Sequence, residues 1–135
     1  GWGNPATLDT DDTGDVSAPH VAVNAAGNAV VAWSWAADSG GGNYVYNVWA
    51  TRYLPGIGWG NAEPLDSNNV QQPNLAPHAA VSANQNAIVV WHRRDNGIDH
   101  VKSSQYSAGA GWVQSLETDP AVVSRNDWIF SLIVD

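Results

Sequence analysis

The sequence predicts an all-β fold built from four-stranded antiparallel β-propeller blades, and three observations lead to this prediction. First, a fifteen-residue unit occurs twice, as PHVAVNAAGNAVVAW (Pro19–Trp33) and PHAAVSANQNAIVVW (Pro77–Trp91), with nine identical positions at a constant offset of 58. Second, each copy has the pattern of a β-hairpin, in which two apolar strands flank a polar turn. Third, no segment carries a 3.6-residue apolar period long enough for a helix.

The second strand of each hairpin favours a propeller over a simple sandwich. The segments AVVAWSW, starting at Ala29, and AIVVW, starting at Ala87, are apolar on both faces instead of alternating. Such a strand needs cover on both sides, because each of its faces buries apolar side chains. Antiparallel sheets packed face to face around an axis provide that cover.

Each repeat is predicted to form four strands, which we label a to d in chain order. Gly-Trp segments mark the d strands, at Gly1–Asp9, Gly58–Asp66 and, in a shorter form, Gly111–Glu117. The first complete repeat is expected to have strands at Val21–Asn24, Ala29–Trp35, Val45–Leu54 and Trp59–Asp66. The second is expected to have them at Ala79–Ser82, Ala87–His92, His100–Tyr106 and Trp112–Glu117.

These strands divide the chain into four parts. Residues 1–16 are strand d of a preceding blade plus a linker, 17–66 are blade 1, 67–118 are blade 2, and 119–135 are the first two strands of a third blade. About two and a half to three blades make an incomplete ring, and exposed sheet faces and edges favour association. The chain is therefore expected either to be a fragment of a larger ring, which is the favoured interpretation, or to assemble with other copies.

Composition excludes some partners. Thirteen acidic and five basic side chains give a formal charge of −8, which argues against a nucleic-acid partner because phosphate binding needs clustered Lys and Arg. There is no apolar run long enough to insert into a membrane, and there is no Cys for disulfides or thiolate chemistry. Because the chain starts at Gly1 and contains no Met, we expect a processed chain or a fragment.

The first repeat also resembles a known group of proteins. The unit PHVAVNAAGNAVVAW, followed by WATRY, PGIGWG and EPLD, is similar to repeats of large secreted bacterial β-propeller proteins of the sialidase-like and lectin-like kind. The turns GIGWG and GAGWV are similar, over a short stretch, to those of small fucose-binding propeller lectins that close a ring from several chains. The resemblance implies a secreted, extracellular, bacterial protein with a carbohydrate-binding role.

A carbohydrate site is expected between blades. Trp59 and Trp112 occupy equivalent Gly-Trp turns, Arg52 ends strand c, and Glu63 lies in strand d. Aromatic plates beside a guanidinium and a carboxylate hold sugar rings through ring-face contacts and charge-assisted hydrogen bonds. Packing of the Trp side chains between blades is the alternative.

Arg93 is a further candidate contact, for an acidic ligand. It follows strand b of the second repeat, as part of an expected exposed hairpin end.

A calcium site is a second candidate. In the segment DTDDTGD, Asp9, Asp11, Thr13 and Asp15 alternate around a turn that contains Gly14, and calcium prefers oxygen ligands arranged in this way. The segment lacks the downstream bidentate Glu of a complete calcium loop, so a solvated linker between blades is the alternative. His20 and His78, which both follow Pro, are expected to bond to a neighbouring blade rather than to a metal.

No catalytic pattern is found. Four Arg and two Glu, spread over different repeats, do not provide a sialidase site or a pair of positioned glycosidase carboxyls. The sequence therefore predicts a non-enzymatic propeller module that binds a glycan or protein ligand. The alternatives are a structural or protein-interaction repeat of a larger or fibre-forming protein, with blade faces that contact other copies or the rest of a longer chain, and the non-catalytic part of a sialidase-like glycosidase.

Overall fold

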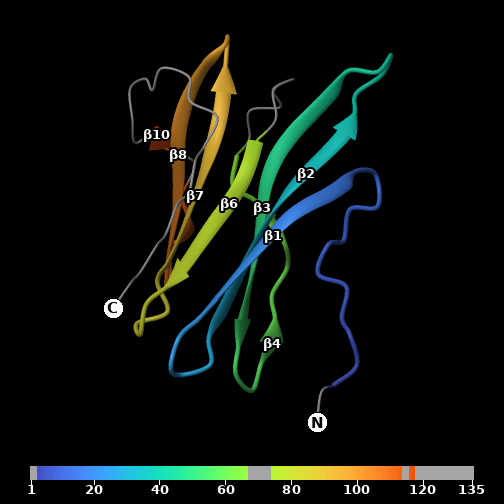
Figure 1. Cartoon of the computed structure of the whole chain (residues 1–135). Helices are drawn as coiled ribbons and strands as arrows, with labels where there is room; N and C mark the ends of the chain where they lie inside the picture. Colours follow the sequence, from blue (N-terminus) through green and yellow to red (C-terminus); the bar gives the residue numbers. More distant parts are fainter. Residues whose placement is uncertain (1–2, 67–73, 114–115, 118–135) are drawn as a thin grey trace.

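The chain forms two antiparallel β-sheets that lie side by side (Figure 1). The computed structural model describes residues 3–66, 74–113 and 116–117. Sheet 1 contains β1 (Asp15–Val23), β2 (Ala29–Asp38), β3 (Tyr44–Leu54), β4 (Gly58–Trp59) and β5 (Glu63–Pro64). Sheet 2 contains β6 (Asn74–Val81), β7 (Ala87–Asp95), β8 (Ile98–Ser107), β9 (Gly111–Trp112) and β10 (Leu116–Glu117). The described residues contain no helix, and hence none that could span a membrane, so the all-β prediction is confirmed.

Strands a, b and c form in both repeats where the sequence predicts them, and they are longer than predicted. Strand d differs, because in each repeat it pairs with strand c only through two short pieces, β4 and β5 in sheet 1 and β9 and β10 in sheet 2. The strand expected over Gly1–Asp9 does not form in residues 3–9, where no described strand pairs with this segment. The hairpin expected in 119–135 lies outside the described residues, and the described sheets do not close a ring.

The innermost strand of each sheet carries the same irregularity. The pairing of β1 with β2 shifts between Ser17 and His20, and that of β6 with β7 shifts between Leu75 and His78. In both bulges the residue before Pro is an Ala with positive φ, at 49° for Ala18 and 44° for Ala76. The bulge lets the strand continue past a Pro that cannot donate a backbone hydrogen bond.

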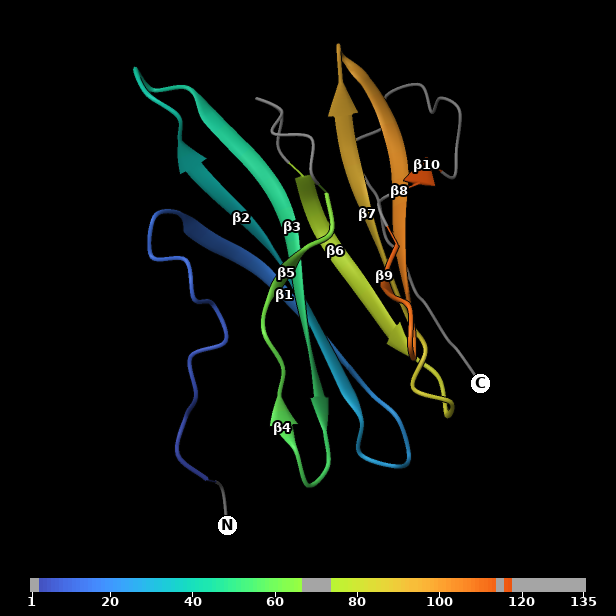
Figure 2. The ribbon, with the colours of Figure 1, turned by 180° about the vertical axis from the view of Figure 1, so that it is seen from behind.

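The main core lies between the two sheets. It is formed by the contact face of sheet 1 (Val30, Ala32, Val48 and Ala50), the contact face of sheet 2 (Ala79, Val81, Val89 and Trp91) and Leu65. Because side chains alternate along a strand, each sheet also has an opposite face, which we call its far face. Figures 1 and 2 show residues 3–14 running along the side of sheet 1 that points away from sheet 2.

Candidate functional site

A groove of ≈180 Å³ lies between the two sheets, at the end where strands c turn into strands d. Sheet 1 and its turn provide most of the lining, with Tyr106 and Trp112 of sheet 2 opposite. The lining residues are Arg52, Leu54, Ile57, Gly58, Gly60, Asn61, Glu63, Tyr106 and Trp112. Three of the residues predicted to bind a ligand, Arg52, Glu63 and Trp112, thus come together from both repeats.

Arg52 joins the two sheets across this groove. Its guanidinium carbon lies 3.6 Å from the centroid of the Tyr106 ring, and its Nη2 donates a hydrogen bond of 3.1 Å to the backbone carbonyl of Gln85. The stacked position fixes the guanidinium plane by a cation–π contact. Since the guanidinium has five N–H donors and Gln85 accepts from one, the group retains donors for a ligand.

Glu63 provides the acceptor on the same side of the groove. It lies in β5, where its backbone pairs with Ala50, and its side chain is exposed. No ion pair joins it to Arg52 in the described part of the chain. The groove therefore presents one cation and one anion that do not neutralise each other by direct contact, with a local charge that sums to zero.

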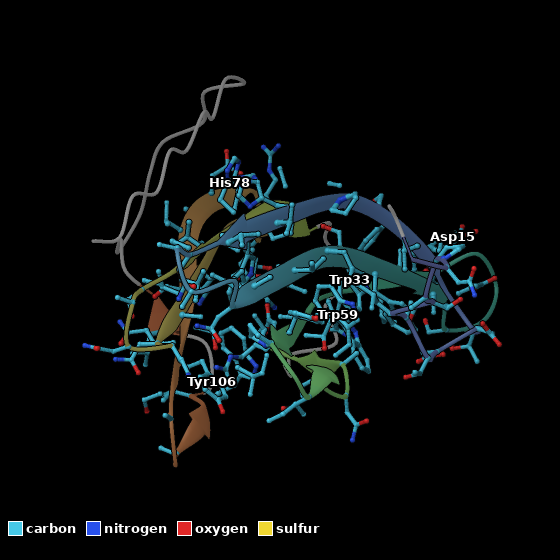
Figure 3. All side chains as sticks on the ribbon, turned by 90° about the horizontal axis from the view of Figure 1, so that it is seen from below. Asp15, Trp33, Trp59, His78 and Tyr106 are labelled. Carbon is cyan, nitrogen blue, oxygen red and sulfur yellow. The ribbon has the colours of Figure 1, made fainter. Side chains whose placement is uncertain are left out.

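Each Gly-Trp turn builds a Tyr–Trp pair, and the two pairs lie on opposite sides of sheet 1. Trp112 packs on Tyr106 with ring centroids 5.4 Å apart, and Trp59 packs on Tyr53 at 5.3 Å. Tyr53 is next to Arg52 on β3, so the two side chains point to opposite faces of the strand. Trp59, cross-strand from Tyr53, therefore lies on the far face of sheet 1 and not in the groove, as Figure 3 illustrates with Trp59 and Tyr106 on different sheets.

Arg93 does not lie at an exposed hairpin end, so the structure corrects its expected position. Its side chain is only 2% exposed, and it bonds to Asp66, which follows β5 of sheet 1, and to Asp95 through an Nε–Oδ1 contact of 3.0 Å. The Asp66 carboxylate is itself fully buried. Arg93 is thus an ion-pair partner between the sheets and is inaccessible to a ligand in the groove.

The acidic segment is organised by local turns. The Asp9 carboxylate accepts a hydrogen bond from the backbone N–H of Asp11, and the Asp11 carboxylate accepts from the backbone and the hydroxyl of Thr13. These bonds from Thr13 lower the pKa of Asp11. No group of three or more His, Asp or Glu side chains suited to a metal occurs among the described residues, and Asp15 lies at the start of β1. The calcium site remains a prediction without a supporting ligand cluster.

The two repeated histidines meet where β1 and β6, the innermost strands of the two sheets, contact each other. Their ring centroids are 4.7 Å apart, and Nδ1 of His20 accepts a 3.0 Å hydrogen bond from the backbone N–H of Ala79. Burial and the neighbouring His78 lower the pKa of His20. The expectation that His20 bonds to the next repeat is confirmed.

Sequence reasoning missed several groove residues, among them Tyr106 and Asn61, and it also missed Asn24, which organises a turn. Tyr106 has a recognisable signal, because Tyr ends strand c in both repeats, whereas Asn61 has none. Asn24 was not singled out, yet its Oδ1 accepts from the backbone N–H groups of Ala26 and Asn28, and its Nδ2 donates to the carbonyl of Ser82 in sheet 2. An Asn at the first position of a polar turn is a typical Asx-turn signal.

Comparisons of this chain with protein-family models and with curated proteins find no match.

Proposed function

We propose that this chain is a non-enzymatic, extracellular β-propeller module that binds a glycan in the groove between its two sheets. The observation that carries the proposal is the convergence of Arg52, Glu63 and Trp112 on one groove from separate strands and both repeats. A propeller arrangement is supported by two repeats that form similar sheets and pack through opposite faces, so that the face of sheet 2 in the core corresponds to the far face of sheet 1.

The chemistry of the groove suits a sugar ring. Trp112 and Tyr106 offer aromatic surface to the C–H groups of a ring, while Glu63 accepts from hydroxyl groups and Arg52 donates to hydroxyl oxygens. Hydrogen bonds to ionised groups are about twice as strong as neutral ones, which gives a polar ligand an orientation. These four side chains combine the apolar and polar contacts of a small-molecule site.

Size and charge narrow the ligand class. At ≈180 Å³ the groove is smaller than the roughly 300–1,000 Å³ of sites for drug-sized molecules, which favours one sugar unit at the end of a glycan. One Arg and one Glu provide no excess positive charge, so a neutral sugar is favoured over a sialylated or sulfated one.

The test is a glycan array followed by titration calorimetry with the best ligand. Glu63→Gln removes the anionic acceptor at an exposed position, and Trp112→Ala removes the aromatic wall. We expect each change to raise the Kd at least about tenfold, the equivalent of 1.4 kcal/mol.

Trp59→Ala is the matched control. It deletes an equivalent Trp from an equivalent Tyr–Trp pair that lies outside the groove, so binding should persist. An array without hits on folded protein would contradict the proposal. So would equal losses in Trp59→Ala and Trp112→Ala with no effect of Glu63→Gln, which would indicate a structural role for both Trp residues.

A further inference from the structure

A second pocket, of ≈270 Å³, lies on the far face of sheet 1, away from the groove. Its walls come from that face and from the N-terminal segment that runs along it (Figure 2). The lining residues are Leu8, Asp9, Val16, Ser17, Pro19, Val31 and Trp33. Asp9 is the one charged residue among them, so the pocket combines mainly apolar walls with a single carboxylate.

The apolar walls are accessible and leave room for a small molecule. Val16 is 51% exposed, and Leu8 and Val31 are half-buried. Trp33 is 4% exposed, so its ring forms a floor of which only a small part faces the pocket. Because an apolar cavity of about 150 Å³ is enough to bind benzene, ≈270 Å³ accommodates a ring with a short arm.

Asp9 brings a negative charge that no described residue neutralises. Its Oδ1 accepts a 3.1 Å hydrogen bond from the backbone N–H of Asp11, and none of the described ion pairs includes it. A carboxylate has about four acceptor sites, so acceptors remain for a ligand. Residues 1–51 contain five Asp and no Lys or Arg, so this part of the sequence supplies no counter-ion.

The second repeat shows which kind of group the equivalent carboxylate binds. Asp66 is the repeat equivalent of Asp9, and it bonds to the guanidinium of Arg93. The first repeat has Trp35 at the position of Arg93, so Asp9 lacks the corresponding cation. A positively charged ligand would supply at Asp9 the charge that Arg93 supplies at Asp66.

We propose that this pocket binds a small organic ammonium ion, with its apolar body against Leu8, Val16 and Val31 and its charged nitrogen on the Asp9 carboxylate. Charge complementarity selects a cation, because a hydrogen bond between two ionised groups is stronger than one to an alcohol, and an anion is repelled. The volume lies just below the roughly 300–1,000 Å³ of sites for drug-sized molecules, which favours a small free ligand. The proposal goes beyond glycan binding and does not depend on the groove.

Three probes of similar size and different charge provide the test. They are 2-phenylethylammonium, the neutral 2-phenylethanol and the anion phenylacetate. In titration calorimetry the ammonium probe should bind saturably, with a Kd at least about tenfold below that of the alcohol, and phenylacetate should bind more weakly than both. Nuclear Overhauser contacts from the ring protons of the ammonium probe to the methyl groups of Val16 and Val31 should locate it in the pocket.

Asp9→Asn tests the role of the charge. The Asn side-chain oxygen can still accept from the backbone N–H of Asp11, so the local turn should be preserved. This variant should raise the Kd of the ammonium probe at least about tenfold and remove its preference over the alcohol. Asp12→Asn is the matched control, because Asp12 is exposed in the same acidic segment and does not line the pocket, so the preference should persist.

Four results would overturn the proposal. The first is the absence of saturable binding of the ammonium probe to folded protein, which would make the pocket a packing surface only. The second is an equal Kd for the ammonium and the alcohol. The third is an equal loss in Asp9→Asn and Asp12→Asn, which would indicate general attraction to the acidic segment. The fourth is a set of Overhauser contacts to Tyr106, which would place the probe in the groove.

Discussion

At the residue scale, Ala18 and Ala76 hold a left-handed backbone conformation that alanine disfavours. Both side chains are exposed, so nothing is packed against them that would offset the cost. The left-handed region costs an L-residue about 1–2 kcal/mol, while Gly loses about 0.5–1 kcal/mol more than Ala in conformational entropy on folding.

We expect Ala18→Gly and Ala76→Gly each to raise the free energy of unfolding by about 0.5–1 kcal/mol, as measured by urea denaturation. Ala25→Gly is the control, since Ala25 is exposed in the β1–β2 turn and has a negative φ. That change should lower stability slightly. Destabilisation by all three would show that the left-handed conformation carries no cost here.

The individual groove residues show which positions could be assigned from the sequence alone. Arg52 and Glu63 could be assigned because both flank a repeated Gly-Trp turn, which places them near each other in any pairing of strands c and d. Trp59 was placed in the site for the same reason, but the alternation of side chains on β3 and β4 puts it on the other face. A shift of one residue decides the face, and proximity in sequence does not reveal it.

At the element scale, the link between Asp66 and Arg93 fastens the end of sheet 1 to strand β7. Both charges are buried, so removing one leaves the other uncompensated, which typically costs about 3–5 kcal/mol. The first repeat has Trp35 at the position of Arg93, and Gly14 lies so close to the Trp35 ring that an added Cβ would be 2.5 Å from it. An ion pair in one repeat thus corresponds to an aromatic contact in the other.

Arg93→Met should therefore lower the free energy of unfolding by about 3–5 kcal/mol in urea denaturation. Asp66→Leu combined with Arg93→Met should recover most of that loss, because the double variant leaves no buried charge. A single variant that costs less than about 1 kcal/mol would show that the ion pair contributes little.

Strands a to c were predictable because, in both repeats, segments of apolar and β-branched residues are separated by polar turn residues. The Asn96-Gly97 turn, with φ values of 50° and 82°, is a further local signal for the β7–β8 hairpin. Strand d was predictable only in position, since its length depends on a partner strand and not on its own residues. The Asp66–Arg93 link joins residues 27 apart in the sequence, and no local pattern indicates it.

At the scale of the whole molecule, the contact between His20 and His78 makes the joint between the sheets sensitive to pH. Nδ1 of His20 must be unprotonated to accept from Ala79, and its lowered pKa reflects burial and the adjacent His78. The unfolded chain therefore binds a proton at His20 more readily than the folded chain does. Stability from this contact is present above the unfolded pKa of 6.5 and is lost as the pH falls below it.

Thermal unfolding should show this dependence. The Tm of the unmodified chain should fall between pH 7.5 and about pH 5.5, and the fall should be smaller in His20→Asn, whose side-chain oxygen can still accept from Ala79 but does not titrate. Parallel pH profiles for the two proteins would assign the pH dependence to other groups.

The small size of the groove bears on how strongly the proposed glycan ligand would be bound. Under the proposed function, a groove that fits one sugar unit would hold an isolated ligand weakly, and Arg52 occurs once in each chain. If copies of the chain assemble, which is one of the two alternatives that the sequence predicts, the particle would present several such grooves. Linked sites can raise avidity by about 10²–10⁴ over a single site without any new contact. The molecule would then discriminate by ligand density, binding surfaces that carry many glycan ends in preference to free sugar.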